Sequence, residues 1–305
     1  MKRFCKFGMV LCLIAGMTQS VWANTPSEAF LQAVEILGSK EIEQEAPKEE
    51  NFPYVEPTEY IPVLMYHHFA IRDIEQGDGI TTKQAQLEEQ VKYFKEQGYR
   101  LISMEELDNI LSKREQEKDI DGDIGLDLKV KYLCITMDDG YYSNYDLAYP
   151  IFKKYQVPAT IFAITDSITH QIGLKKITWD NASEMLNKSK VGIYNHTCNH
   201  IPISKTTTEE FVDAALAAED ALQENLPTRR THVKALAYPN GQTNEELQKA
   251  LEEEGFSLAF TVQPGVIEGT TSRLAIPRIT VESGMTGEDV VKRIEKTAAR
   301  TMYQK

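Results

Sequence analysis

Short runs of apolar residues alternate with amphipathic stretches from about residue 60 to the end of the chain. Continuous apolar runs of this kind are typical of strands that are buried on both faces of a parallel sheet. The predicted strands are 61–66, 99–102, 130–137, 159–164, 191–194, 233–238, 258–262 and 276–281. Between them, apolar residues with helical spacing predict helices around 87–97, at 104–111, before 155, at 179–186, 209–224 and 244–254, and after 287.

This alternation of strands and helices without a linker is typical of one α/β domain with a mainly parallel sheet. The spacing favours an irregular (β/α) barrel of about seven to eight strands over two separate domains. The expected domain spans 60–305, with a loop containing Gly77 and Gly79 after the first strand and a charged surface insertion at 113–129. In such a barrel the carboxyl ends of the strands share one rim, where catalytic side chains gather.

The segment before this domain has a different composition. Basic residues precede the apolar stretch 7–17, and Ala23 is a small residue at which a signal peptidase could cut, so 1–23 is predicted to be a secretory signal peptide. The alternatives are an uncleaved anchor, for which the stretch is shorter than the roughly 20 residues of a spanning helix, and a lipoprotein cut before Cys12. Residues 24–59 are acidic and contain prolines, which predicts a linker. We expect a secreted or cell-envelope protein with no stable membrane span after cleavage.

The formal net charge of −13 restricts the partners. It repels phosphate backbones and anionic lipid head groups, so we expect no nucleic acid and no membrane surface as partner, and a neutral or cationic substrate fits better. No protein partner is predicted. Cys134 and Cys198 remain after signal cleavage and could pair in an oxidising compartment, but the sequence leaves both thiol and disulfide open.

Two acidic residues follow directly on a predicted buried strand. Asp138 and Asp139 come after 130–137 and precede Gly140. Adjacent carboxylates are costly at this place unless something positive binds them, and the carboxyl-terminal rim of a barrel is where active sites form. The pair therefore predicts either a functional site or a turn capped by Asp.

Two histidines follow another predicted strand, 191–194. His196 and His200 are four residues apart, and in a helical turn this spacing places both imidazoles on one face, with Cys198 pointing away. With one carboxylate they form an open site with three protein ligands, which predicts a divalent metal, zinc being the expected ion. A metal in such a site activates water and polarises a carbonyl, as hydrolysis of an amide or ester requires. The second carboxylate of the Asp pair is then available as general base.

The motifs around these residues resemble those of the polysaccharide deacetylases, carbohydrate esterase family 4. Segment 136–140, Thr-Met-Asp-Asp-Gly, resembles the first family motif, and 196–200, His-Thr-Cys-Asn-His, resembles the second. Segment 237–241 lies where the third motif is expected. Segments 62–68, 98–99 and 179–180 resemble the branch that includes deacetylases of poly-N-acetylglucosamine, and the resemblance covers roughly residue 60 to the carboxyl terminus.

The resemblance implies roles for individual residues. Asp138 would be the general base, Asp139 would bind the metal with His196 and His200, and the backbone N–H of Asn240 would hold the oxyanion. The candidates for substrate contacts lie on or near the motif segments and are Tyr141, Trp179, Tyr238 and Arg278.

Three features depart from the family pattern. Ala237 stands where the family has an arginine that orients the base, and Asn240 where it has an aromatic residue. The late Leu-x-His that supplies the general acid is absent, because the corresponding strand reads Ile-Pro-Arg at 276–278. His67 follows the first strand and so lies at the same rim, which makes it the candidate acid; the alternative is a packing or hydrogen-bonding role.

The sequence therefore predicts a secreted metal-dependent hydrolase that removes N-acetyl or O-acetyl groups from a polysaccharide such as poly-N-acetylglucosamine or peptidoglycan. A glycan-binding homologue that keeps the metal but has lost turnover is the alternative. Two histidines and one carboxylate also form the site of non-haem iron oxygenases. The alternation of strands and helices argues against that class, whose barrels are usually all-β.

Overall fold

The computed structural model of the chain describes residues 52–72, 79–121, 128–229 and 231–304. All described elements belong to one compact unit, residues 51–305. The predicted signal peptide 1–23 and most of the predicted linker 24–59 lie outside the described residues. Among the helices that are described, none is long and apolar enough to cross a membrane.

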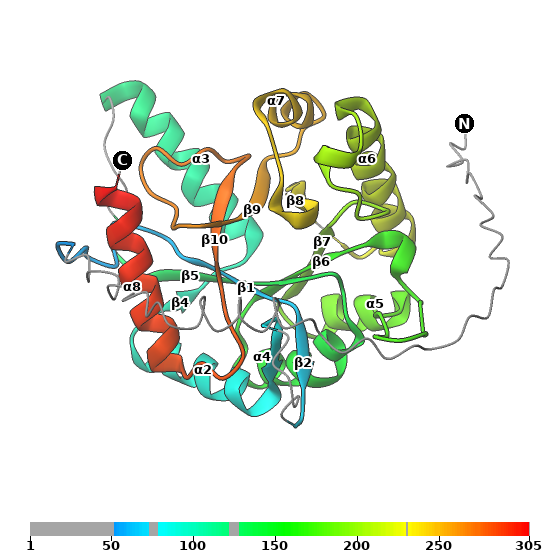
Figure 1. Ribbon diagram of the computed structural model, residues 1–305, viewed down its shortest axis with the longest axis horizontal. Helices are drawn as coiled ribbons and strands as arrows, with labels where there is room; N and C mark the ends of the chain where they lie inside the picture. Colours follow the sequence, from blue (N-terminus) through cyan, green and yellow to red (C-terminus); the bar gives the residue numbers. More distant parts are fainter. Residues whose placement is uncertain (1–51, 73–78, 122–127, 230, 305) are drawn as a thin grey trace, which may run out of the picture. The chain divides into compact units, whose positions relative to one another are not determined.

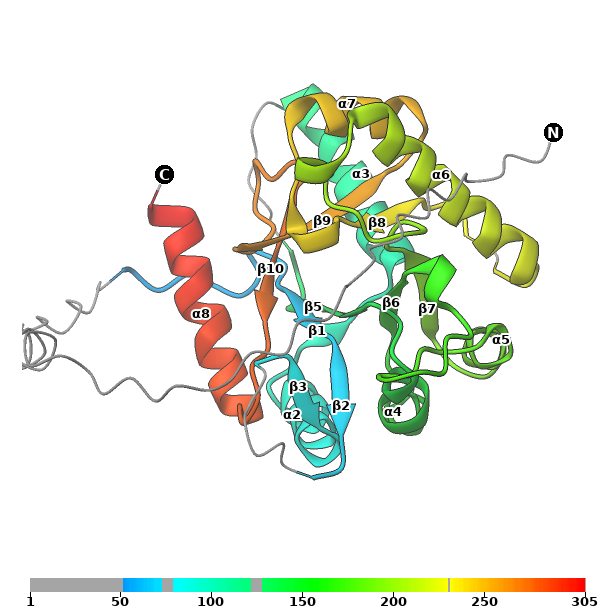
Figure 2. The same cartoon turned by 45° about the vertical axis from the view of Figure 1, so that its right-hand side comes forward.

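Parallel strands form the centre of this unit (Figures 1 and 2). They are β1 (Val63–Tyr66), β4 (Arg100–Leu101), β5 (Tyr132–Asp138), β6 (Ala159–Ala163), β7 (Val191–Asn195), β8 (Ala235–Ala237), β9 (Leu258–Pro264) and β10 (Ile276–Thr280). Their order is β1-β10-β9-β8-β7-β6-β5-β4, and β1 also pairs with β5. This second pairing closes a barrel of seven strands, with β4 as an extra strand beside β5. The predicted irregular (β/α) barrel is confirmed.

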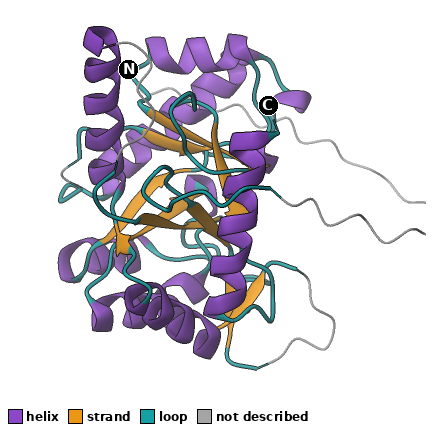
Figure 3. Cartoon of the chain, turned by 90° about the vertical axis from the view of Figure 1, so that its left-hand side faces the viewer, coloured by secondary structure: helices purple, strands orange, loops and turns teal. Residues whose placement is uncertain are grey.

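Helices surround the strands, as Figure 3 shows in purple around orange. They are α2 (Gln84–Glu96), α3 (Met104–Asp121), α4 (Tyr149–Tyr155), α5 (Trp179–Lys188), α6 (Thr208–Asn225), α7 (Glu245–Glu253) and α8 (Gly287–Tyr303). A π-helical turn, η1 (Asn144–Ala148), leads into α4. Single 3₁₀ turns, η2 (Thr165–Ser167), η3 (Ile203–Lys205) and η4 (Pro239–Gly241), follow β6, β7 and β8 along the chain.

Local sequence explains where these elements form. Every residue of β1 and of β6 is buried, as the continuous apolar runs predict. Thr178, Thr207 and Thr286 precede α5, α6 and α8, and each side chain accepts a hydrogen bond from a backbone N–H in the first turn of its helix. Caps of this kind contribute about 1 kcal/mol each, so they fix where these helices begin.

Two local predictions were wrong. The predicted helix 104–111 is too short, because α3 continues as far as Asp121 into the charged stretch 113–129 that was predicted to be a surface insertion. The segment after His67 is not only a loop, because β2 (His68–Ala70) and β3 (Thr81–Lys83) form a separate two-stranded parallel sheet.

The sequence left open whether Cys134 and Cys198 are thiols or a disulfide. In the structure both are buried free thiols.

Candidate metal centre

The strand pairings bring the predicted motifs to one rim of the barrel. The pairing of β1 with β5 ends one residue before His67 and Asp138, so these two residues follow at the same level on neighbouring strands. The pairing of β6 with β7 ends at Asn195, directly before His196, and Asn195 is also paired with β8. Motifs that are far apart in the sequence therefore meet at the carboxyl ends of the strands.

Asp139, His196 and His200 converge on one point. One ligand atom from each lies within 4.8 Å of the other two, and no other described group of at least three His, Cys, Asp or Glu residues meets this criterion. Nε2 of His196 is 3.4 Å and Nε2 of His200 is 3.7 Å from Oδ1 of Asp139. Ligands about 2.0–2.2 Å from a tetrahedral zinc ion are about 3.3–3.6 Å apart. The two distances to Asp139 are close to this spacing, so the three side chains suit one such ion.

The His196 ring is oriented by a backbone group. Its Nδ1 lies 2.7 Å from the carbonyl oxygen of Ala237 in a buried hydrogen bond. The carbonyl can only accept, so Nδ1 carries a proton, and Nε2 is the ring nitrogen that faces Asp139 and His200. A hydrogen bond of this kind on the second ring nitrogen is usual for histidines that bind metals.

The loop that carries the two histidines is not the helical turn that their spacing predicted. Thr197 and His200 have positive φ angles of 60° and 58°, in the left-handed region. The side chain of Asn195 accepts a hydrogen bond from the Thr197 N–H (2.7 Å), and the Thr197 hydroxyl accepts one from the His200 N–H (3.0 Å). These bonds hold an irregular loop in which the imidazoles still meet, with ring centroids 4.7 Å apart.

Backbone strain is concentrated at the same rim. Besides the two residues of the histidine loop, Asp139 and Asn240 have φ angles of 70° and 55°. Left-handed geometry is uncommon for residues other than glycine and costs about 1 kcal/mol or more for each residue. Such residues cluster where side chains or N–H groups must be aimed at a ligand.

The charge states suit a metal cation. Burial raises the pKa of Asp139, but the hydrogen bond and charge of His196, the charge of Lys176 and a hydrogen bond from Tyr141 outweigh this and hold that pKa below its ordinary value. Burial and the charge of His196 lower the pKa of His200. Asp139 is therefore a carboxylate and His200 a neutral imidazole, the forms that bind metal.

Asp138 forms a buried ion pair with Arg278 from β10. The two guanidinium nitrogens donate to the two carboxylate oxygens at 2.7 and 2.6 Å, and both side chains are almost fully buried. Arg278 also donates to the carbonyl oxygen of Thr261 and to the hydroxyl of Thr136. Burial raises the pKa of Asp138, but the charge and hydrogen bonds of Arg278 lower it by more, so the carboxyl group stays ionised.

Two predicted substrate contacts are corrected by this burial. Arg278 is 0% exposed and its guanidinium is engaged with Asp138, so it holds the carboxylate and does not face a glycan. Tyr238 is also 0% exposed, and its hydroxyl donates to the carbonyl oxygen of Leu274 at 2.8 Å. Burial raises the pKa of Tyr238 to about 12. Both side chains are structural parts of the rim.

The other predicted site residues lie at or near the surface. Asn240 is exposed in η4, and His67, Tyr141 and Trp179 are partly buried. The carbonyl oxygen of His67 accepts a hydrogen bond from Asn144 at 2.7 Å, and the charge of His67 acts on Asp138. Solvent reaches the side chains at these four positions, whereas Arg278 is fully buried.

Sequence reasoning missed Lys176, which lies beside the candidate metal ligands. Its ammonium nitrogen is 3.6 Å from the centroid of the Tyr141 ring, and its charge acts on Asp139 and His200. Burial lowers the pKa of Lys176, while Asp139 raises it again in part. No local pattern marks this residue, because its position depends on a backbone contact across the rim.

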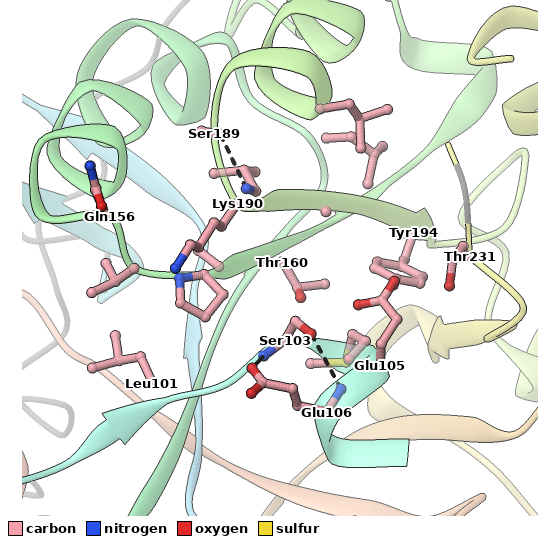
Figure 4. A pocket seen from close by; sticks show the side chains of 18 of the residues that line it. Leu101, Ser103, Glu105, Glu106, Gln156, Thr160, Ser189, Lys190, Tyr194 and Thr231 are labelled. Atoms are coloured by element: carbon pink, nitrogen blue, oxygen red, sulfur yellow. Dashed lines mark hydrogen bonds between the residues drawn. The ribbon is translucent and has the colours of Figure 1, made fainter. Parts of the chain in front are cut away.

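A cavity of about 690 Å³ lies elsewhere on the barrel (Figure 4). It is lined by Ala159 and Val191, which begin β6 and β7, and by Glu105 at the start of α3. The hydroxyl of Tyr194 donates to the carboxylate of Glu105 across it. His196 and His200 follow the opposite end of β7, about 13 Å away for a five-residue strand. This cavity is therefore not part of the candidate metal centre.

Comparison with known proteins agrees with this geometry. Residues 126–259 match the family described as polysaccharide deacetylase. The Bacillus subtilis protein YxkH, which is named as a polysaccharide deacetylase, is 30% identical over 227 residues that cover 74% of this chain and 73% of the relative. The chain belongs to the polysaccharide deacetylase family.

Two further comparisons show how far the likeness extends. The solved structure of the Streptococcus pyogenes deacetylase PplD in complex with acetate has a TM-score of 0.66 and 25% identity, covering 80% of this chain and 100% of that one. The poly-β-1,6-N-acetyl-D-glucosamine N-deacetylase of Staphylococcus epidermidis is 30% identical over 159 residues, which cover 49% of this chain and 54% of the relative. The resemblance to this branch of the polysaccharide deacetylases is confirmed.

Proposed function

We propose that this polysaccharide deacetylase is a metal-dependent, secreted enzyme that removes N-acetyl groups from poly-N-acetylglucosamine. The observation that carries the proposal is the convergence of Asp139, His196 and His200 beside the paired carboxylate of Asp138. The relative named for poly-β-1,6-N-acetyl-D-glucosamine supports the substrate class. The net charge of −13 also suits a glycan that is neutral before deacetylation and cationic after it.

The donor set indicates which residues hold the metal. Asp139, His196 and His200 bind one divalent ion, and one carboxylate with two neutral imidazoles favours zinc. When bound, the metal supplies Lewis-acid activation of water and of the amide carbonyl. Asp138 accepts a proton from the attacking water, and Arg278 holds Asp138 ionised and oriented for this.

Two further residues complete the proposed chemistry. The backbone N–H of Asn240, in the left-handed turn that follows β8, stabilises the oxyanion of the tetrahedral intermediate. His67 donates a proton to the departing amine, because it lies level with Asp138 on the neighbouring strand and is partly exposed at the rim. Tyr141 and Trp179, also partly exposed, remain the candidates for contacts with the glycan.

Release of acetate tests the proposed function. The purified domain should release acetate from oligomers of β-1,6-linked N-acetylglucosamine, and a chelator should abolish the release until zinc is added back. A protein that takes up one equivalent of zinc and binds the oligomer but releases no acetate would instead be the glycan-binding homologue. Full activity in the chelator would contradict metal dependence.

The proposed acid role of His67 is tested by a choice of leaving groups. An amine must be protonated before it departs, whereas the phenolate of an aryl acetate needs no protonation. His67→Ala should therefore lower deacetylation of an N-acetylated oligomer by about 10²-fold or more and leave hydrolysis of an aryl acetate within a few-fold of the wild type. His170→Ala, at an exposed histidine, is the control. Equal losses on both substrates would assign His67 to packing or substrate binding.

A further inference from the structure

We propose that a groove on the outer wall of the barrel binds N-acetylated sugars of the glycan that lie beyond the sugar being deacetylated. The inference rests on the proposed function and adds a second binding region to it. This region, the outer groove, is lined by residues of 240–243, of 261–277 and of the carboxyl-terminal end of α8. Its volume of about 930 Å³ lies within the range of small-molecule sites, about 300–1,000 Å³.

The outer groove exists because one connection of the barrel contains no helix. A helix lies between the other consecutive barrel strands, but 265–275, which the structure describes throughout, joins β9 to β10 by turns and bends. In Figure 2 this side of the barrel is flanked by α8. A Cβ on Gly265 would lie 2.8 Å from the Pro277 side chain and 3.5 Å from the Thr301 hydroxyl. Glycine therefore lets the connection pass close to β10 and α8, and part of the outer wall stays uncovered.

The outer groove begins at the candidate site. Asn240, whose N–H is the proposed oxyanion donor, is exposed and lines the groove. Thr261 also lines it, and its carbonyl oxygen accepts a hydrogen bond from Nε of Arg278 at 2.8 Å. The same guanidinium binds Asp138, the proposed base. A glycan that is bound at the candidate metal centre can therefore continue past Asn240 into the groove.

The side chains of the outer groove suit neutral sugars. Amide groups of Asn240, Gln242 and Gln263 stand at exposed positions, and Ser272 and Thr297 add hydroxyl groups. Amides and hydroxyls both donate and accept hydrogen bonds, as the hydroxyl and acetamido groups of N-acetylglucosamine do. These groups provide the polar contacts of a glycan subsite.

Apolar surface lies between these polar groups. Val262 is 38% exposed, and Pro264 and Pro277 also line the groove. Such side chains can cover the C–H face of a sugar ring, since small-molecule sites combine apolar walls with a few polar groups.

Charge distinguishes acetylated from deacetylated sugars in the outer groove. Of the described residues that line it, Arg300 alone carries a charge, although the whole chain has a net charge of −13. Removal of an acetyl group converts a neutral sugar into a cationic amine, for which these residues provide no carboxylate and one repelling cation. We therefore expect the groove to bind acetylated stretches of the glycan and to disfavour glucosamine.

The dependence of acetate release on oligomer length tests the outer groove in the full chain. For β-1,6-linked N-acetylglucosamine oligomers, kcat/KM of the wild type should rise with length until the groove is filled, because contacts remote from the reacting group contribute to transition-state binding. Thr297→Trp fills the groove from α8 and should remove this rise, while hydrolysis of an aryl acetate stays unchanged. Lys296→Trp, at an exposed residue of the same helix outside the groove, should behave as the wild type.

Two further variants test the chemistry of the groove. Gln263→Ala should lower kcat/KM on long oligomers by about two- to ten-fold, the usual net value of one hydrogen bond, and leave the shortest substrate unaffected. The wild type should prefer a fully acetylated oligomer to one of equal length with a single acetyl group by more than the number of acetyl groups explains. Arg300→Glu supplies a carboxylate and should reduce this preference, whereas Arg300→Lys should keep it.

The possible results separate the groove from the proposed function. A wild type that is equally fast on all lengths, or a normal length dependence in Thr297→Trp, overturns the glycan site and leaves the deacetylase function standing. An unchanged preference in Arg300→Glu overturns the selection by charge. Absence of acetate release from every oligomer overturns the proposed function and this inference with it. Should thermal unfolding show that Thr297→Trp does not fold, Gln263→Ala and Arg300→Glu still decide the question.

Discussion

Replacing Asp138 with Asn is expected to lower the rate of acetate release by about 10²–10⁴-fold, the usual contribution of a general base. Asparagine has nearly the same shape but cannot accept a proton from water. The carboxylate is ionised in the protein because the guanidinium of Arg278 binds both of its oxygens. Asp138 is not among the residues whose ligand atoms converge, so Asp138→Asn should retain one equivalent of zinc.

The complementary variant is His200→Ala, which removes a ligand and leaves Asp138 intact. It should lose both zinc and activity, whereas Asp138→Asn loses only activity. Metal content by mass spectrometry of the native protein, measured beside acetate release, distinguishes the two. Loss of zinc from Asp138→Asn, or turnover near the wild-type rate with zinc bound, would contradict the assignment of the base.

The parallel barrel could be predicted because its strands are buried on both faces. In β1 and β6 every residue is buried, and the sequence correspondingly shows unbroken apolar runs. The small sheet of β2 and β3 has three residues in each strand. It depends on distant contacts, such as the hydrogen bond from the Phe69 N–H to the Ser143 hydroxyl. Such contacts leave no periodic signal.

The end of α3 was missed for a related reason. After Leu111 the chain is dominated by charged residues, which resemble a surface loop in composition but are good helix formers. One of them, Arg114, is buried and donates to the carbonyl oxygen of Glu268, so a tertiary contact supports the helix beyond its apolar part. Local hydrophobicity contains no information about this partner.

Part of the candidate site could be predicted from the sequence because the candidate metal ligands lie in two short segments. Asp138 and Asp139 are adjacent, and His196 and His200 are four residues apart, so each pair is visible locally. The partner of Asp138 is not, since Arg278 is 140 residues away in the chain. The sequence did contain one signal, an arginine inside an apolar strand. A buried arginine needs a negatively charged partner and hydrogen-bond acceptors.

The contacts of Ala237 and Arg278 explain one departure from the family pattern. The family arginine that orients the base is replaced by Ala237, whose carbonyl oxygen orients His196. The guanidinium comes instead from β10, where Arg278 reaches Asp138. Asp138, the proposed base, therefore has an arginine partner that comes from a different strand.

Replacing Arg278 with Met should destabilise the protein by about 3–5 kcal/mol at pH 7, because it leaves the carboxylate of Asp138 buried without a partner. The size of this effect follows from burial, since the side chains of Arg278 and Asp138 are 0% and 3% exposed. Arg293→Met is the matched control: this arginine pairs with Glu282 near the surface, with side chains 34% and 55% exposed. Its loss should cost no more than about 1 kcal/mol.

The pH dependence of Arg278→Met gives the sharper test. In the wild type Arg278 holds the pKa of Asp138 below its ordinary value, so the pair contributes stability that is lost only as the pH falls through that low pKa. Without Arg278, burial raises the pKa of Asp138, and the variant loses stability as the pH rises above about 4, the ordinary pKa of Asp. Its deficit in unfolding free energy relative to the wild type, measured by urea unfolding, should therefore shrink from pH 7 toward pH 4.

The acid limb of the pH profile of its residual acetate release should also move to higher pH, because Asp138 is protonated more easily. The double variant with Asp138→Asn buries no unpaired charge and should recover much of the lost stability. A deficit that is the same at every pH and persists in the double variant would show that Arg278 matters only for packing.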